Sequence, residues 1–347
     1  MTDTPLVSVI MPVYNGEHFL REAVESILDQ TLKDFEFIII NDGSADGTKA
    51  ILESYQDKRL KILHFQKNQG ISTCVNTGLD MAIGQYIARM DADDISQPTR
   101  FEKQIRFFED HKEIGICGTW VELMGDTTGV IWKYPSISDA IYARMLFNSA
   151  IANPSVMMRA VILKQHNLKY MTDRLYGEED YDLWSRALFV THFANIPEVL
   201  LQYRIHSSSI SRVNQQKLEE GVRTVVYPRL LSRLGIEYSE SDLYLHGQIG
   251  QNHFGTDLVF LKKARQWLEQ LAIVNRHVNL IAPYALETEL GDRWTQICSF
   301  SQEQPWRVFL QILSSPLPYR NYTGIIKMVR AFVFLARKSL RRFRLSN

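Results

Sequence analysis

The sequence Tyr86-Ile87-Ala88-Arg89-Met90-Asp91-Ala92-Asp93-Asp94 places three carboxylates directly after a short, mainly apolar run. The run predicts a strand, and at its extended end Asp91 and Asp93 project from the same face. Two such carboxylates repel each other unless a cation lies between them. One or two carboxylates completed by phosphate oxygens are a usual site for Mg²⁺ or Mn²⁺. An acidic turn that caps the following helix explains the residues equally well, so this stretch alone leaves both interpretations open.

Strands and helices alternate on the N-terminal side of this stretch. Apolar runs at Leu6–Met11, Phe35–Ile40 and Leu60–Phe65 predict three further strands, and helical spacing recurs over residues 19–28 and 72–82. This alternation, with continuously apolar strands, predicts an α/β fold whose mainly parallel sheet is covered by helices on both faces. In such sheets ligands bind beyond the carboxyl ends of the strands.

The loops at these strand ends contain short polar side chains and glycine: Pro12-Val13-Tyr14-Asn15, Asn41-Asp42-Gly43-Ser44 and Asn68-Gln69-Gly70. None of them is a Gly-x-Gly-x-x-Gly or Walker loop, which argues against a dinucleotide site or an ATPase. Tyr14 can stack on a base, and Asp42 can accept a hydrogen bond from a base or a ribose. An ordinary turn with a helix cap remains the alternative for the segment around Asp42.

Beyond the acidic cluster, a helix is predicted after Pro98, followed by a hairpin of Ile114–Met124 with Val130–Tyr134. Further strands are predicted at Asn153–Met158 and Val199–Arg204.

Two polar features of this region have alternative explanations. Glu178, Glu179 and Asp180 open a predicted helix, where they are favourable charges at a helix N-terminus or supply a general base. His206 follows the last strand, either as a surface residue or as a ligand.

Composition indicates a globular protein, with 45% hydrophobic and 22% charged residues among 347. This length exceeds one average domain, so we expect an α/β domain over residues 1–212 and a helical region over 213–347. Three widely spaced cysteines predict no disulfide framework. The first apolar run resembles a strand rather than a signal peptide, and no stretch is long and apolar enough to span a bilayer. We therefore expect a cytoplasmic protein.

The net charge of zero conceals an asymmetry. After Glu303 there are nine Lys or Arg and no acidic residue, so residues 1–303 carry 30 basic against 39 acidic groups. Over residues of about 321–347, apolar and Arg side chains can occupy different sides of one helix. This predicts a basic amphipathic tail that contacts an anionic membrane surface. The alternative is a tail packed on its own domain, with its terminal Lys and Arg side chains interacting favourably with the helix dipole. We expect no nucleic-acid partner.

These loops together resemble the family 2 glycosyltransferases of the GT-A fold, and the resemblance covers roughly residues 5–212. Five segments carry it in order: Val7-Ser8-Val9-Ile10-Met11-Pro12-Val13-Tyr14-Asn15, Asn41-Asp42-Gly43-Ser44-Ala45-Asp46-Gly47-Thr48, Asp91-Ala92-Asp93-Asp94, Glu179-Asp180-Tyr181-Asp182-Leu183-Trp184 and Tyr203-Arg204-Ile205-His206. The resemblance implies inverting transfer of a sugar from a nucleoside-diphosphate sugar, with a UDP-sugar favoured. The implied acceptor is a hydroxyl of a glycan or of a lipid-linked molecule, in bacterial cell-surface polysaccharide or lipopolysaccharide assembly.

The resemblance also implies residue roles. It places Asp42 at the base, Asp91 near the ribose and Asp180 as the general base, with Glu179 as the alternative base. The implied nucleotide-sugar site consists of Pro12, Tyr14, Asn15, Asp42, Asn68, Gly70, Asn76, Asp91 and Ala92. The implied ligands of a divalent metal, Mn²⁺ or Mg²⁺, are Asp93, Asp94 and His206.

The sequence departs from the family pattern at three places. Asn41 stands where many members have a first Asp, and Val75 stands where many have an Arg before Asn76. The segment that begins at Asn153 lacks a His that often precedes the Pro. These departures bear on contacts with the nucleotide and with the acceptor.

Two other functions fit part of the pattern. A sugar nucleotidyltransferase also joins a metal, a nucleotide and a sugar on an α/β sheet, but the sequence lacks its N-terminal glycine-rich loop with a following Lys or Arg. It would release pyrophosphate rather than a nucleoside diphosphate. A non-catalytic nucleotide-sugar or glycan-binding module would bind without turnover.

Overall fold

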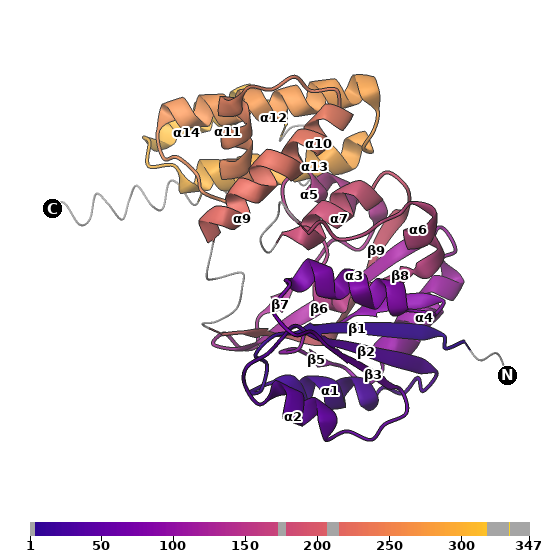
Figure 1. Cartoon of the computed structure of the whole chain (residues 1–347). Coiled ribbons are helices and arrows are strands. Elements are labelled where there is room, and N and C mark those ends of the chain that lie inside the picture. The colour runs from indigo at the N-terminus through magenta and orange to yellow at the C-terminus, as the bar shows by residue number, and fades with distance from the viewer. Residues whose placement is uncertain (1–3, 173–177, 207–214, 318–332, 334–347) are drawn as a thin grey trace. The chain divides into compact units, whose positions relative to one another are not determined.

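The computed structural model describes residues 4–172, 178–206, 215–317 and 333. The chain divides into two compact units (Figure 1). The α/β unit comprises Met1–Ile141 and Ser149–Gly221, and the helical unit comprises Tyr142–Asn148 and Val222–Asn347. The domain boundary predicted after residue 212 falls within residues 207–214, outside the described residues, and stays a prediction.

Four parallel strands form one half of the sheet of the α/β unit. They are β1 (Val7–Val13), β2 (Phe35–Asn41), β3 (Leu60–His64) and β4 (Tyr86–Arg89), in the order β3-β2-β1-β4. Every residue of β1, β2 and β4 is buried. This burial on both faces explains their continuous apolar runs.

Helices cover both faces of these strands (Figure 1). One face packs against α1 (Leu20–Leu28), α2 (Thr48–Glu53) and α4 (Arg100–Asp110). Ile38 and Ile40, which alternate with the β2 residues of that face, pack instead with Cys74 of α3 (Ile71–Met81). The predicted layer arrangement is therefore confirmed.

The other half of the sheet is mixed. Its strands are β5 (Ile95–Ser96), β6 (Ile114–Gly125), β7 (Ile131–Trp132), β8 (Met157–Arg159) and β9 (His192–Ile205). Strand β8 is antiparallel to both β4 and β6, whereas β9 is parallel to β6 and pairs with β5 at the edge. The predicted hairpin is present as the antiparallel pair of β6 and β7. The accompanying helices are α5 (Ser138–Met145), α6 (Ala160–Gln165) and α7 (Glu179–Ala187).

Two predicted strand boundaries were wrong, and each error involves a proline. Asn153–Ser155 forms a 3₁₀ turn rather than the start of a strand, because Pro154 has a fixed φ and no N–H to donate. The last strand begins at His192, seven residues before the predicted Val199. Its pairing with β6 jumps from Ile196 to Val199, so Pro197 lies in a bulge that interrupts the strand pattern in the sequence.

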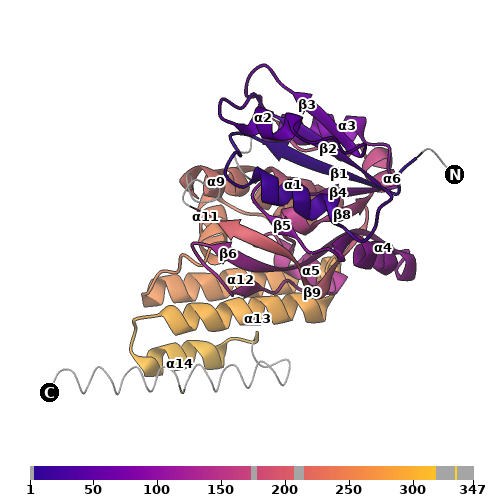
Figure 2. The ribbon, with the colours of Figure 1, turned by 90° about the horizontal axis from the view of Figure 1, so that it is seen from below.

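The C-terminal part of the chain is helical, as predicted. After α9 (Gln215–Gly221) and a π-turn at Val222–Val226 come α10 (Tyr227–Arg233), α11 (Glu240–Gly250), α12 (Leu258–Val278), α13 (Pro283–Phe300) and α14 (Pro305–Ser314). Figure 2 shows α12 alongside α13. None of the described helices combines the length and apolarity needed to cross a membrane. The predicted basic tail of about 321–347 lies outside the described residues except for Val333.

The segment Tyr142–Asn148 belongs to the helical unit although it lies within the first half of the chain. Phe147 is fully buried there, stacked on His246 at 4.6 Å between ring centroids and 4.1 Å from the guanidinium of Arg293. Arg293 also donates to the Asn148 side chain at 2.9 Å, and His246 Nε2 lies 2.8 Å from the Leu146 carbonyl. Burial lowers the pKa of His246 to about 4, so this core contact involves a neutral ring at neutral pH.

Candidate active site

Strands β1, β2 and β4 are parallel, so their carboxyl ends meet at one edge of the sheet. The loops after β1 and β2 are joined there by hydrogen bonds. Asn15 donates its N–H to Ser44 Oγ at 2.9 Å and accepts from Ala45 N at 2.9 Å through Oδ1. Asn15 has φ +50°, a left-handed conformation that asparagine tolerates. The side chain of Tyr14 next to it is 53% exposed, whereas Pro12 is buried within β1.

Asp42 connects a third loop to this edge. Its buried carboxylate accepts the N–H of Gln69 at 2.7 Å through Oδ1 and the N–H of Gly70 at 2.9 Å through Oδ2. Gly70 has φ +90°, and a Cβ placed there would meet no atom within 4 Å. The backbone at Gly70 therefore borders open space beside Asp42, while the neighbouring Asn68 is exposed.

Asn76 has a structural partner. Its Nδ2 donates to the Tyr170 carbonyl at 2.8 Å, and its Oδ1 accepts the Tyr170 N–H at 2.9 Å. The side-chain amide thus anchors the segment that precedes α7. Of the predicted nucleotide-site residues, this one is engaged with the backbone of the fold rather than joined to the loops around Asp42.

The three aspartates after β4 have different environments. Asp91 Oδ1 accepts from Arg89 at 2.7 Å, and Asp93 Oδ2 lies 2.9 Å from His206 Nε2. Asp94 is 1% exposed, and its Oδ1 accepts the N–H of Arg204 at 2.8 Å. Its other oxygen, Oδ2, is buried without a hydrogen-bond partner among the described residues. Ala92, between these side chains, is partly buried.

Burial and mutual repulsion disfavour the ionised forms of two of these aspartates. Burial raises the pKa of Asp93, and the charge of Asp91 adds to this, while His206 lowers it. Burial raises the pKa of Asp94 well above its ordinary value, with Asp93 and Asp91 acting in the same direction. A cation at this position would stabilise the ionised carboxylates.

The donor atoms fit a divalent metal that is bound together with substrate phosphates. The described residues contain no group of three or more His, Cys, Asp or Glu side chains arranged to hold a metal. Asp93 and His206 supply one carboxylate and one imidazole. Asp94 follows Asp93 in the sequence, but its unpartnered oxygen is buried, and the three side chains do not form such a group. Mg²⁺ and Mn²⁺ accept one or two protein carboxylates when phosphate oxygens complete the shell.

A second acidic group opens α7. Burial and the neighbouring charge of Glu179 raise the pKa of Asp180 to about 7, and Asp91 adds to this while Arg89 opposes it. Asp180 Oδ1 accepts the N–H of Tyr181 at 2.7 Å, and Glu179 is 5% exposed. The two acidic clusters, about ninety residues apart in the sequence, therefore lie within electrostatic reach of each other.

Glu178 and Asp182 flank this pair in different ways. Burial raises the pKa of Glu178 well above its ordinary value, with Asp180 and Glu179 adding to the effect. Asp182 is fully buried and forms an ion pair with Arg186 at 2.7 Å. Asp182 thus has a structural partner on its own helix.

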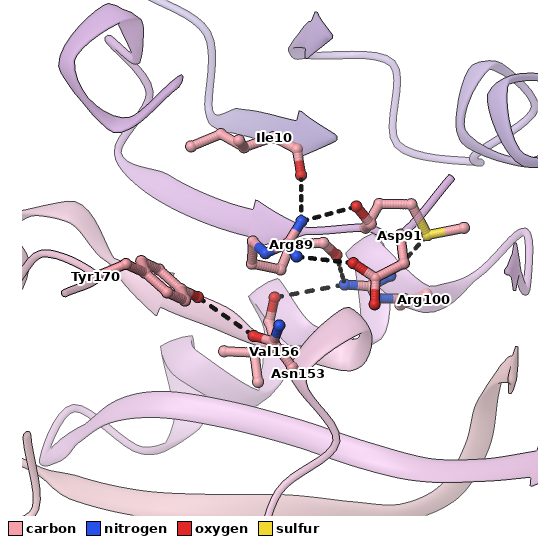
Figure 3. A network of polar contacts seen from close by, with 8 residues as sticks. Ile10, Arg89, Asp91, Arg100, Asn153, Val156 and Tyr170 are labelled. Atoms are coloured by element: carbon pink, nitrogen blue, oxygen red, sulfur yellow. Dashed lines mark hydrogen bonds and ion pairs between the residues drawn. The ribbon is translucent and has the colours of Figure 1, made fainter. Parts of the chain in front are cut away.

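The sequence predictions missed three arginines that hold this site. Arg89 and Arg100 are at most 1% exposed, and Figure 3 shows them beside Asp91. Arg204 is the third of these arginines and belongs to the motif Tyr203-Arg204-Ile205-His206. Its Nε donates to the Asp93 carbonyl at 2.7 Å, and its guanidinium lies 4.4 Å from the ring of Phe19. A charged residue inside the apolar run Tyr86–Met90 was the available signal, because an arginine is rarely buried without a specific partner.

Comparisons with known proteins identify the family to which this chain is similar. Residues 8–160 match the model of Glycosyl transferase family 2. An uncharacterized glycosyltransferase of Haemophilus influenzae is 36% identical over 252 residues, which cover 68% of this chain and 78% of that protein. TuaG of Bacillus subtilis, whose name assigns it to teichuronic acid biosynthesis, is 30% identical over 213 residues, covering 60% of this chain and 82% of that protein.

The fold agrees as well. The crystal structure of residues 1–349 of S. aureus TarS in complex with UDP-GlcNAc matches with a TM-score of 0.58 at 18% identity, covering 97% of this chain and 91% of that one. At this identity the likeness concerns the fold, which is the GT-A fold. The family assignment rests on the sequence matches above. The chain belongs to glycosyltransferase family 2.

Proposed function

We propose that this glycosyltransferase is metal-dependent and inverting, and that it moves a sugar from a nucleoside-diphosphate sugar to a hydroxyl of a glycan or lipid-linked acceptor. The observation that carries the proposal is that two acidic groups interact: Asp91, in the cluster where Asp93 pairs with His206, raises the pKa of Asp180. A UDP-sugar is the favoured donor, in line with the UDP-GlcNAc bound to TarS. The name of TuaG supports a role in cell-surface polysaccharide assembly.

The proposed donor site lies at the carboxyl edge of β1, β2 and β4. The exposed ring of Tyr14 can stack on the base, and the open space at Gly70 lets backbone approach the nucleotide. Asp42 holds the loop at Gln69 and Gly70 by accepting their two backbone N–H groups. Its carboxylate keeps lone pairs that can accept a hydrogen bond from the nucleotide base. Asp91, held by Arg89, is the proposed acceptor for a ribose hydroxyl.

The proposed metal ligands are Asp93, Asp94 and His206. When bound, a divalent metal supplies Lewis-acid stabilisation of the charge that develops on the leaving diphosphate. Arg204 orients these ligands, since it donates to Asp94 Oδ1 through its N–H and to the Asp93 carbonyl through its guanidinium. The proposed ligands come from two strand ends, since Asp93 and Asp94 follow β4 and His206 follows β9.

Asp180 is the proposed general base, which accepts the proton of the attacking acceptor hydroxyl. A base functions best when its pKa lies near the working pH, and a value of about 7 meets that condition. Glu179 is the alternative base, because it is the immediate neighbour of Asp180 and, like Asp180, interacts with the charge of Arg89. We assign the reaction to a glycosyltransferase domain proposed over residues 1–212, which is followed by a helical region over residues 213–347.

The decisive experiment is a transfer assay with a panel of nucleotide sugars, with and without Mn²⁺, in which the released nucleotide is identified. We expect a nucleoside diphosphate to accumulate in a metal-dependent manner. Release of pyrophosphate would instead identify a sugar nucleotidyltransferase. Binding of a nucleotide sugar in a thermal-shift screen, with neither hydrolysis nor transfer, would identify a non-catalytic binding module.

We also propose that the C-terminal part contacts an anionic membrane surface from the cytoplasmic side, which suits a lipid-linked acceptor. Helix α14 supports this. Trp306, Leu310 and Leu313 recur at four- and three-residue spacings and are 59%, 51% and 43% exposed. Arg307 lies beside them, and no acidic residue follows Glu303. Arg307 pairs with Glu303 at 3.5 Å, so the excess of basic charge comes from the sequence after this helix. An apolar helix face followed by such a sequence suits the interface of an anionic bilayer.

Vesicle binding tests this proposal. We expect the full chain to bind vesicles that contain anionic lipid, with binding that weakens as salt rises. Truncation before residue 325, or replacement of Trp306 and Leu310 by Ser, should abolish most of it. Replacing Val259 and Ile273 by Ser is the matched control, because these α12 side chains are equally exposed and should have little effect. Equal vesicle binding by the full and truncated chains would contradict the proposal.

A further inference from the structure

Arg89 is the last residue of β4, and its side chain is 1% exposed. Burying a guanidinium is costly unless specific partners receive its charge and its N–H groups. One guanidinium nitrogen, NH1, donates hydrogen bonds to two backbone carbonyls, that of Met90 at 2.8 Å and that of Ile10 at 3.2 Å. NH2 donates to Asp91 Oδ1 at 2.7 Å, while Nε has no hydrogen-bond partner among the described residues.

A second buried arginine holds the backbone at this position. Arg100 NH2 donates to the Arg89 carbonyl at 2.8 Å and lies 3.4 Å from the Val156 carbonyl (Figure 3). Burial lowers the pKa of Arg100 to about 9, and Arg89 contributes in the same direction. Two like charges close together in the protein interior lower its stability. The burial of Arg89 therefore needs another explanation than a gain in folding stability.

The acidic groups on the other side of Arg89 explain it better. Burial alone would lower the pKa of Arg89, but Asp91, Tyr170 and Glu179 raise it above its ordinary value. Tyr170 is itself fixed, because its hydroxyl donates to Asn153 Oδ1 at 3.2 Å and its backbone pairs with Asn76. The guanidinium of Arg89 therefore interacts with acidic residues from two elements, Asp91 after β4 and Glu179 at the start of α7.

We propose that Arg89 is a positioning residue shared by the two carboxylates of the proposed reaction: its guanidinium fixes the Asp91 side chain, and its charge acts on Asp180 from inside the protein. The inference rests on the proposed function. Arg89 is too buried to touch the donor or the acceptor, so its role is exerted through these two residues.

The charges around Asp180 determine the expected effect. Glu178 and Glu179 on its own chain segment repel its ionised form, as does Asp91 at the end of β4, and Tyr170 lies nearby. Arg89 is a positive charge that opposes them, because it lowers the pKa of Asp180. Removing that charge must raise the pKa of Asp180, so a smaller fraction is ionised at pH 7.

The test compares Arg89→Met with Arg159→Met. Arg159 on β8 is a matched control, since its guanidinium donates to the backbone carbonyls of Ile114 and Phe108, away from both acidic groups. We expect Arg89→Met to shift the acidic limb of the kcat/KM–pH profile upward by about one unit. At pH 7 the rate should fall about fivefold and recover almost fully at pH 9. Arg159→Met should leave the limb in place.

Two further measurements test the same inference, one without an activity assay and one with a second substitution at Arg89. Carboxyl ¹³C titration of Asp180 should show the same upward shift in Arg89→Met. Arg89→Lys keeps the charge but lacks the planar fork that holds Asp91. We expect it to weaken UDP binding about tenfold by calorimetry in the presence of Mn²⁺, with the acidic limb unmoved.

The outcomes separate the inference from the proposed function. A folded Arg89→Met protein with an unmoved Asp180 titration would overturn the inference. If Arg89→Met does not fold, unchanged UDP affinity in Arg89→Lys would overturn it. A parent protein that transfers no sugar from any donor would refute the proposed function. The titration and the UDP measurement would still decide whether Arg89 positions the two carboxylates.

Discussion

Replacing Asp180 by Asn should reduce sugar transfer by about 10²- to 10⁴-fold, the usual contribution of a positioned general base. The amide has nearly the same size but cannot accept the proton of the acceptor hydroxyl. Nucleotide affinity should be almost unchanged, because the proposed donor site is formed by the loops after β1 and β2, whereas Asp180 belongs to α7. Single-turnover transfer and UDP calorimetry measure the two quantities separately.

The matched variant for this prediction is Glu179→Gln. If Asp180 is the base, Glu179→Gln should remain active, and its acidic limb should move to lower pH, because Glu179 helps to raise the pKa of Asp180. Loss of transfer in Glu179→Gln, together with full activity in Asp180→Asn, would assign the base to Glu179 instead.

The pH dependence of the parent enzyme follows from the same group. A base must be unprotonated, and the pKa of Asp180 is about 7. Transfer should therefore be high above pH 7 and fall as the pH drops through that value. An ordinary aspartate would keep activity down to about pH 4. A rate that stays flat from pH 8 to 5 would contradict a general base with a pKa of about 7.

The second large effect concerns Asp93, which pairs with His206. Asp93→Ala should lower transfer by about 10²- to 10³-fold, since it removes a ligand of the metal that stabilises the leaving diphosphate. It should also remove the increase in UDP affinity that Mn²⁺ produces. His206→Ala should act in the same direction, and the double variant should be only slightly worse than Asp93→Ala, because both residues serve one ion.

An exposed acidic residue provides the control for Asp93. Asp80 is 63% exposed and forms a surface ion pair with Lys169, so Asp80→Ala should leave both measurements unchanged. Equal Mn²⁺-dependent UDP affinity in Asp93→Ala and Asp80→Ala would contradict the proposed metal site.

The sequence was sufficient to predict the parallel half of the sheet because β1, β2 and β4 are buried on both faces and are therefore continuously apolar. It was insufficient for β9, whose fourteen residues include Pro197 in a bulge. A bulge depends on the partner strand, and no local pattern encodes it. The short β8 was shifted for a related reason, since Pro154 belongs to the turn that precedes it.

The candidate site was predictable to the same extent. The loops after parallel strands must share one edge, which located Asp42, Asp91 and Asp93 before their contacts were known. The arginines were not predicted, because whether Arg89 is buried depends on carboxylates from α7, about ninety residues later. The engagement of Asn76 with the Tyr170 backbone likewise depends on residues 94 positions apart.

The segment Tyr142–Asn148 has a consequence for how this protein is made. During synthesis Leu146 leaves the ribosome 100 residues before its partner His246, and Asn148 leaves 145 residues before Arg293. Until then Phe147, which ends fully buried, has no core to enter. The chain between α5 and the 3₁₀ turn therefore cannot reach its final packing until α11 and α13 have been synthesised, and the apolar Phe147 lacks these partners until then.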